Sequence, residues 1–166
     1  MIPTDTSQRD WTHATWPELS VHVLGHYHAA HRQQLPELIR LARLVEQAHD
    51  GHMDCPHGLT DELCALSQEL ESHMRKEEDV LFPLVSQGLG ATASAPIVVL
   101  RSEHEQQGAA LHRLAQLTHD MTAPRSACET WRALYAGLRT FREDLIAHIH
   151  IENNIMFERC APALVN

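Results

Sequence analysis

Two segments of this chain repeat one pattern, in which a histidine and a glutamate interrupt a stripe of apolar residues. HMRKEEDVLF (73–82) and HIHIENNIMF (148–157) both read His-x3-Glu-x4-Phe. Leucines recur every three or four residues before each motif, which is typical of a helix that buries one face. The histidine and the glutamate of each motif lie one helical turn apart and project from that same face. The pattern therefore predicts a helical core that contains ionisable groups.

The repeat extends to one further histidine upstream of each motif. His28 precedes His73 by 45 residues, and His104 precedes His148 by 44. Both upstream histidines interrupt an apolar stripe of their own segment. The chain is thus expected to contain two similar helical hairpins, each of which supplies a histidine and then a His-x3-Glu pair.

Glycine and proline are sparse, with 7 and 8 residues, and they separate long segments that lack both. Alternating long helices and short loops predict an all-α fold, an antiparallel up-down four-helix bundle, over 17–166 after a polar tail over 1–16. Pro36 is expected to kink or break the first helix. The expected helices cover about 17–49, 60–87, 96–121 and 127–159.

Composition excludes several classes of protein. The chain has 13 Lys and Arg against 22 Asp and Glu, a net charge of −9, which argues against binding to nucleic acid or an anionic membrane. The first 16 residues do not resemble a signal peptide, and the longest aliphatic run (97–100) is too short to span a bilayer. The four cysteines form no CxxC pair. We therefore expect a cytoplasmic protein with free thiols.

Histidine is the outlier, with 14 residues, and it is the commonest metal ligand among side chains. Two buried glutamates would repel each other, and no Lys or Arg lies on their stripes. Burying an unpaired carboxylate is costly, so a multivalent cation is the simplest compensation. Imidazole and carboxylate without thiolate suit iron or manganese, with zinc possible. The candidate ligands are His28, His73, Glu77, His104, His148 and Glu152.

Five further residues lie close enough in the helical pattern to support these ligands. His31 shares the face of His28 and is expected to orient a ligand or to pack. Glu69, Glu103 and Asp144 are expected either to orient ligand imidazoles or to face solvent. Gly108 lies one turn beyond His104 and is expected to leave an empty space on the buried face. These candidates are His31, Glu69, Glu103, Asp144 and Gly108.

The ligand set resembles that of the hemerythrin-like proteins, whose fold is a four-helix bundle around two irons. Over about residues 20–160, the chain is more closely similar to the repair-of-iron-centers family. The similar segments are YHAAHRQQLPELIRLARLVEQAH (27–49), SHMRKEEDVLFPLVSQG (72–88), SEHEQQG (102–108) and HIHIENNIMF (148–157). The resemblance implies two iron ions bridged by Glu77 and Glu152 and by an oxo or hydroxo group. It also implies one iron on His28 and His73 and the other on His104 and His148.

The resemblance also implies a role in nitrosative and oxidative stress, with nitric oxide or oxygen as the small ligand. Proteins of this family are associated with the repair of damaged iron–sulfur clusters, so iron–sulfur proteins are expected clients. Members commonly carry an N-terminal domain with cysteines, which we do not expect in this sequence.

Three functions remain open from the sequence. The first is a redox di-iron protein that binds or reduces nitric oxide and supports iron–sulfur repair. The second is a hemerythrin-type protein that binds or senses oxygen or iron without turnover. The third is a metal-free interaction bundle. Oxygen carriers place a second histidine four residues after the first on helix three, where this chain has Gly108, so we do not expect a reversible oxygen carrier. We expect instead that both irons keep an open position for nitric oxide.

Overall fold

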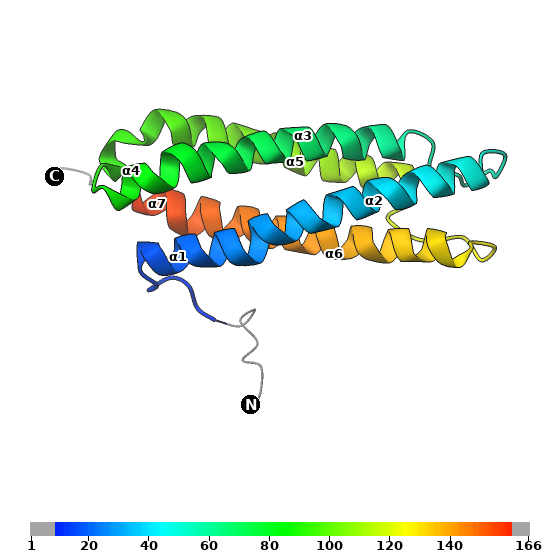
Figure 1. Cartoon of the computed structure of the whole chain (residues 1–166), viewed down its shortest axis with the longest axis horizontal. Coiled ribbons are helices and arrows are strands. Elements are labelled where there is room, and N and C mark those ends of the chain that lie inside the picture. The colour runs from blue at the N-terminus through cyan, green and yellow to red at the C-terminus, as the bar shows by residue number, and fades with distance from the viewer. Residues whose placement is uncertain (1–8, 161–166) are drawn as a thin grey trace.

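The computed structural model describes residues 9–160, which form four long helical arms packed side by side without any strand in that range (Figure 1). The prediction of an all-α four-helix bundle is confirmed. The first two arms consist of α1 (Trp16–His22), η2 (Val23–His28) and α2 (Ala29–Ala48), followed by α3 (Leu59–Lys76), η3 (Glu77–Leu81) and α4 (Phe82–Ser86).

The second hairpin repeats this order. After a single turn, η4 (Gly90–Thr92), it consists of α5 (Ser94–Leu117), then α6 (Glu129–Ile151), η5 (Glu152–Met156) and α7 (Phe157–Arg159). α2 packs against both α3 and α6, and α3 packs against α5. Among the described residues, no helix is both long enough and apolar enough to cross a membrane.

The ends of the helices follow local chemistry. Thr15 and Glu18 form a reciprocal capping box at the start of α1. α3 begins one residue before the expected start, because the Glu46 carboxylate accepts the backbone N–H groups of Gly58 and Thr60. α5 ends at Leu117, before the expected end near 121, because residues 119–121 have φ angles of 50° to 56°. A helix cannot continue through that left-handed conformation.

The break that the sequence predicts near Pro36 does not occur. α2 runs as one α-helix from Ala29 to Ala48 and contains Pro36 in its interior. Pro36 lies on the exposed side of the helix, so the carbonyl group that lacks its usual N–H partner faces water. The buried Leu35 and Leu38 on either side hold the helix in the core. Packing therefore outweighs the local cost of proline.

Three π-helical segments interrupt the α-helices, and each has a candidate ligand at one of its ends. η2 ends at His28, η3 begins at Glu77 and η5 begins at Glu152. In a π-turn the hydrogen bond joins residues five apart, and the N–H of Phe82 indeed bonds the carbonyl of Glu77. The same bond joins Phe157 to Glu152. The Glu-x4-Phe spacing of both motifs is thus the spacing of a π-turn, which brings the phenylalanine into the core.

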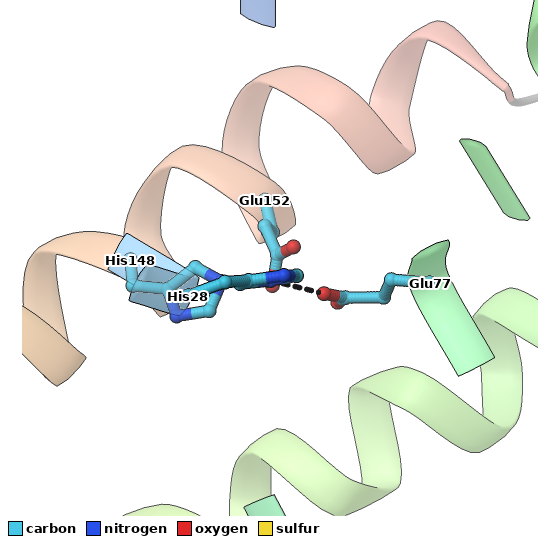
Figure 2. A group of neighbouring side chains, drawn as sticks. All are labelled: His28, Glu77, His148 and Glu152. Carbon is cyan, nitrogen blue, oxygen red and sulfur yellow. Dashed lines mark hydrogen bonds and ion pairs between the residues drawn. The ribbon is translucent and has the colours of Figure 1, made fainter. Parts of the chain in front are cut away.

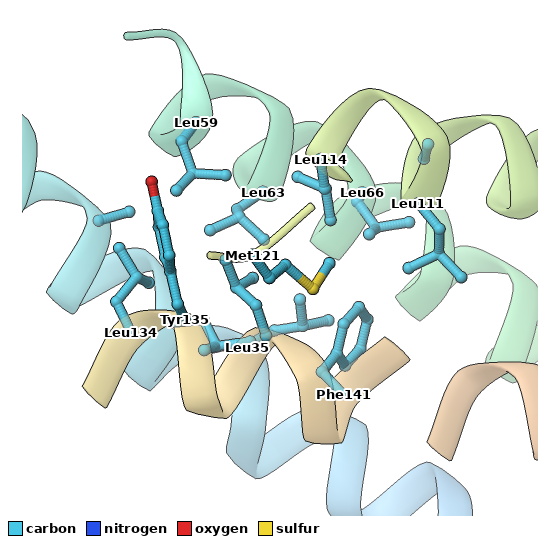
Figure 3. Packing of buried hydrophobic residues seen from close by; sticks show 14 of the residues in the cluster. Leu35, Leu59, Leu63, Leu66, Leu111, Leu114, Met121, Leu134, Tyr135 and Phe141 are labelled. Carbon is cyan, nitrogen blue, oxygen red and sulfur yellow. The ribbon is translucent and has the colours of Figure 1, made fainter. Parts of the chain in front are cut away.

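The core has two apolar parts. The larger fills the bundle between α2, α3, α5 and α6 (Figure 3). The smaller lies under α1, α4 and α7. Buried polar side chains separate the two parts: His28, His31, His73, Glu77, His104, Gln107, His148 and Glu152.

Candidate metal centre

All six candidate ligands lie in this polar layer, and none is more than 3% exposed. Their side chains form two groups of four, and in each group one ligand atom from every member lies within 4.8 Å of the others. One group combines two histidines from the first and fourth arms, and the other combines two from the second and third arms. Both groups contain Glu77 and Glu152. The two glutamates therefore lie between two candidate metal positions.

The first group consists of His28, His148, Glu77 and Glu152 (Figure 2). Glu77 approaches from the opposite side of the group to His148, and its Oε2 lies 3.0 Å from Nε2 of His28. Nε2 of His148 lies 3.2 Å from Oε1 of Glu152. Four converging imidazole and carboxylate groups in the buried core form a candidate cation site.

The second group replaces the two histidines by His73 and His104. Nε2 of His73 lies 2.9 Å from Oε1 of Glu77, and Nε2 of His104 lies 3.0 Å from Oε1 of Glu152. The two Nε2 atoms are 3.1 Å apart. The other ring nitrogen of each imidazole, Nδ1, donates a hydrogen bond to an oxygen, that of His73 to Glu103 Oε2 and that of His104 to Asn153 Oδ1, both at 2.7 Å.

This arrangement fits a bound cation. A neutral imidazole that donates from Nδ1 carries a lone pair on Nε2. Two such lone pairs face each other across 3.1 Å and also face two carboxylates, which is repulsive unless a positive charge lies between them. Across the layer, Nε2 of His148, Oε1 of Glu77 and Oε2 of Glu152 are buried and make no hydrogen bond of suitable geometry, although the first two lie close to an oppositely charged or polar atom. A metal ion would satisfy all of these atoms.

The electrostatics of the layer also favour a cation. Burial and the Glu152 carboxylate raise the pKa of Glu77 well above its usual range. Burial alone lowers the pKa of an imidazole, yet Glu77 and Glu152 raise the pKa of His73 to about 11. Without a metal, the layer thus takes up protons to balance its carboxylates. Metal binding would replace those protons.

The pairing of histidines differs from the one that the family resemblance implies. That pairing joined His28 with His73 and His104 with His148. The structure instead groups His28 with His148 and His73 with His104. The reason is the arrangement of the arms, because η2 packs against α6 and α3 packs against α5. Each candidate metal position therefore takes one histidine from each hairpin.

Three of the five supporting candidates contact the polar layer directly or through one residue. The Glu103 carboxylate accepts a hydrogen bond from Nδ1 of His73. The Glu103 side chain is 18% exposed. Nε2 of His31 lies 3.1 Å from Nδ1 of His148. Asp144 contacts no ligand and bonds to Gln34, which in turn contacts His31.

The other two candidates lie outside the layer. Glu69 is exposed on α3. Gly108 is also exposed, and a Cβ atom built on it meets no heavy atom within 4 Å. The expectation that it leaves an empty space on the buried face is wrong, because the buried face of α5 runs from His104 to Gln107. On α5 the residue three positions after His104, Gln107, shares its buried face, whereas the residue four positions after it, Gly108, does not.

The sequence interpretation missed two residues that contact ligands. Asn153 accepts from Nδ1 of His104 at 2.7 Å, and Oε2 of Glu78 lies 3.5 Å from Nδ1 of His28. Each directly follows a buried glutamate of the motif, so the repeat itself was the signal. Glu78 also pairs with Arg32 at 2.9 Å.

Residues 19–160 match the family model described as the hemerythrin HHE cation binding domain. The iron-sulfur cluster repair protein YtfE of Pectobacterium carotovorum subsp. carotovorum is 46% identical to this chain over 157 residues, which cover 95% of this chain and 70% of the relative. The protein of the same name from Edwardsiella ictaluri is 48% identical over 156 residues, or 94% of this chain and 71% of the relative. That of Yersinia pseudotuberculosis is 46% identical over 153 residues, with 92% and 69% covered.

Proposed function

This chain belongs to the hemerythrin HHE cation-binding family and, within it, to the iron–sulfur cluster repair proteins, and from this premise we propose that it is a non-haem di-iron protein that supports the repair of damaged iron–sulfur centres. The observation that carries the proposal is the sharing of Glu77 and Glu152 by two four-residue groups in one dry layer. Such an arrangement suits two metal ions bridged by carboxylates rather than one ion.

In the proposed centre, four imidazoles and two bridging glutamates hold two iron ions, with an oxo or hydroxo group between them. The absence of cysteine from the two groups favours iron over a soft-metal site. The ligands are His28 and His148 for one ion, His73 and His104 for the other, and Glu77 and Glu152 for both.

We further propose nitric oxide as the small ligand, oxygen as its competitor, and iron–sulfur proteins as clients in the cytoplasm. When bound, two iron(II) ions would supply the two electrons, and solvent the two protons, that the conversion of two nitric oxide molecules to nitrous oxide and water requires. The protein contributes a dry layer between two apolar cores, where small uncharged molecules partition more readily than ions. We also propose that residues 17–166 form the di-iron domain that contains these six metal-binding residues.

Two measurements test this function. Iron analysis of the anaerobically reconstituted chain is expected to give two ions per chain. Nitric oxide is then added to the reduced protein, nitrous oxide is measured, and a nitric-oxide-damaged iron–sulfur enzyme is assayed for recovery. A chain that binds iron but neither forms nitrous oxide nor restores the damaged enzyme would be a binding or sensing protein without turnover. A chain without iron would mean an interaction bundle.

A further inference from the structure

The four imidazoles of the candidate centre differ in what holds their far nitrogen. Nδ1 of His73 and of His104 lies 2.7 Å from a side-chain oxygen of Glu103 and of Asn153, whereas Nδ1 of His28 makes no hydrogen bond and lies 3.5 Å from Oε2 of Glu78. Only His148 faces a further imidazole, that of His31, which is fully buried. His31 is therefore the one supporting histidine among these four contacts.

The hydrogen bonds beyond His148 have a single consistent direction. If Nε2 of His148 faces the metal position, its Nδ1 carries the proton and donates to Nε2 of His31 at 3.1 Å. Nδ1 of His31 then carries a proton and donates to Oε1 of Gln34 at 3.4 Å. The amide nitrogen Nε2 of Gln34 donates to Oδ2 of Asp144 at 2.7 Å. Each group in this series is left with one possible role, which fixes the tautomer of both imidazoles.

Aromatic packing also holds the His148 ring in place. The Tyr27 ring is parallel to that of His148, with an interplanar angle of 4° and 5.1 Å between centroids. His31 in turn packs edge-on against Phe141 at 5.5 Å. Tyr27 and Asp144 both line a surface groove of about 770 Å³. The support of His148 thus reaches from the buried layer to the surface of the bundle.

The equivalent positions around the other candidate metal position, that of His73 and His104, lack this series. Gln107 stands three residues after His104, where His31 stands three residues after His28. The residue equivalent to Gln34 is Ala110, and the one equivalent to Asp144 is the exposed Glu69. Oε1 of Gln107 is buried without a partner. The duplicated motif therefore does not by itself require a residue such as His31.

We propose that His31 is a positioning residue that holds His148 with Nε2 toward the metal position shared with His28, and that Gln34 and Asp144 hold His31 in turn. The proposal rests on the proposed di-iron centre for its consequence, which is that one iron position depends on His31 and the other does not. Removing a hydrogen-bonded support from a ligand histidine weakens metal affinity by roughly 10- to 100-fold.

The test compares His31→Leu with the matched variant Gln107→Leu, and uses His31→Gln as a rescue, because a glutamine oxygen also accepts from Nδ1 of His148. Each chain is reconstituted with ⁵⁷Fe and titrated with a competing chelator, and its Mössbauer spectrum is recorded. We expect His31→Leu to weaken one of the two irons by roughly 10- to 100-fold. Gln107→Leu and His31→Gln are expected to keep both irons. Far-UV circular dichroism checks that each variant is folded.

Equal affinity for both irons in His31→Leu, or the same loss in Gln107→Leu, would overturn the proposal and leave the di-iron centre intact. A second measurement does not depend on iron. Two-dimensional ¹⁵N–¹H spectra of the iron-free chain, labelled at histidine, are expected to show His148 protonated at Nδ1. Protonation at Nε2 instead would overturn the positioning role whatever the iron content.

Discussion

The two hairpins supply the same ligands but support them differently. In each hairpin a π-turn begins at the motif glutamate, and a phenylalanine five residues later stacks on the upstream histidine: Phe82 on His28 and Phe157 on His104, at interplanar angles of 15° and 7°. Ligands, π-turns and stacking rings are thus duplicated. The side chains that hold the far nitrogens of the imidazoles are not.

Three pairs of equivalent positions show the difference. The residue before the upstream histidine, the residue three after it and the residue after the glutamate all differ in chemistry between the hairpins. They are Tyr27 and Glu103, His31 and Gln107, and Glu78 and Asn153. A metal ion demands a fixed set of ligands, whereas an imidazole N–H can donate to any oxygen or nitrogen acceptor of suitable geometry. The constraint on the ligands is therefore stricter than the constraint on their supports.

Removal of metal has the largest expected effect on stability, because both hairpins contribute ligands to each candidate metal position. A ligand that binds only the folded state, at 100 times its dissociation constant, stabilises by about 2.7 kcal/mol per site. We expect the iron-free chain to lose that stabilisation at both positions. Urea unfolding of the loaded and iron-free chains measures it. Identical midpoints would contradict a structural contribution of metal.

The bridging glutamates give the strictest test of equivalence between the hairpins. Because Glu77 and Glu152 belong to both groups, either Glu77→Ala or Glu152→Ala is expected to lose iron from both positions. Glu103→Ala should weaken only the position that contains His73. Metal analysis after reconstitution measures the difference, with exposed Glu105→Ala as the control. If Glu77→Ala kept as much iron as Glu105→Ala, the bridging role would be wrong.

The residues that follow the two glutamates test how strongly the hydrogen-bond distance to a ligand histidine affects iron binding. Asn153 lies 2.7 Å from its histidine nitrogen, whereas Glu78 lies 3.5 Å away and is also held by Arg32. We expect Asn153→Ala to weaken iron binding by about tenfold and Glu78→Ala to weaken it less. Chelator competition measures both. A larger effect of Glu78→Ala would show that charge, rather than hydrogen-bond length, decides the support.

The sequence predicted the duplicated part of this comparison and named three of the supporting residues, His31, Glu103 and Asp144, but it missed the other supports and the pairing of the histidines. Periodicity identified the four helices, and the costly burial of Glu77 and Glu152 pointed to a cation. Pairing across the bundle depends on which arms are neighbours, and the spacing within one arm does not encode that. The supports Glu78 and Asn153 could have been found because each follows a motif glutamate, whereas Gln34 is an ordinary surface residue type and only its packing reveals its contact.

Pro36 and Gly108 show two different limits of local reasoning. At Pro36 the local rule was sound, but the buried leucines on either side outweigh it. At Gly108 the face was misassigned by one position. A shift of one residue on a helix turns a side chain by about 100°, which is enough to move it from the polar layer to solvent.

Gly108 yields the prediction with the smallest expected effect. The residue is exposed within α5, and a new side chain would meet open space, so Gly108→His is expected to keep both irons and the nitric oxide reaction of the parent. Replacing glycine by alanine in a helix interior stabilises by about 0.5–1 kcal/mol, and histidine, a weaker helix former, is expected to stabilise by less. Thermal unfolding of Gly108→Ala and Gly108→His measures this order. Loss of nitric oxide turnover in the histidine variant, with iron retained, would instead mean that position 108 reaches the centre and that the exposed face of α5 is assigned wrongly.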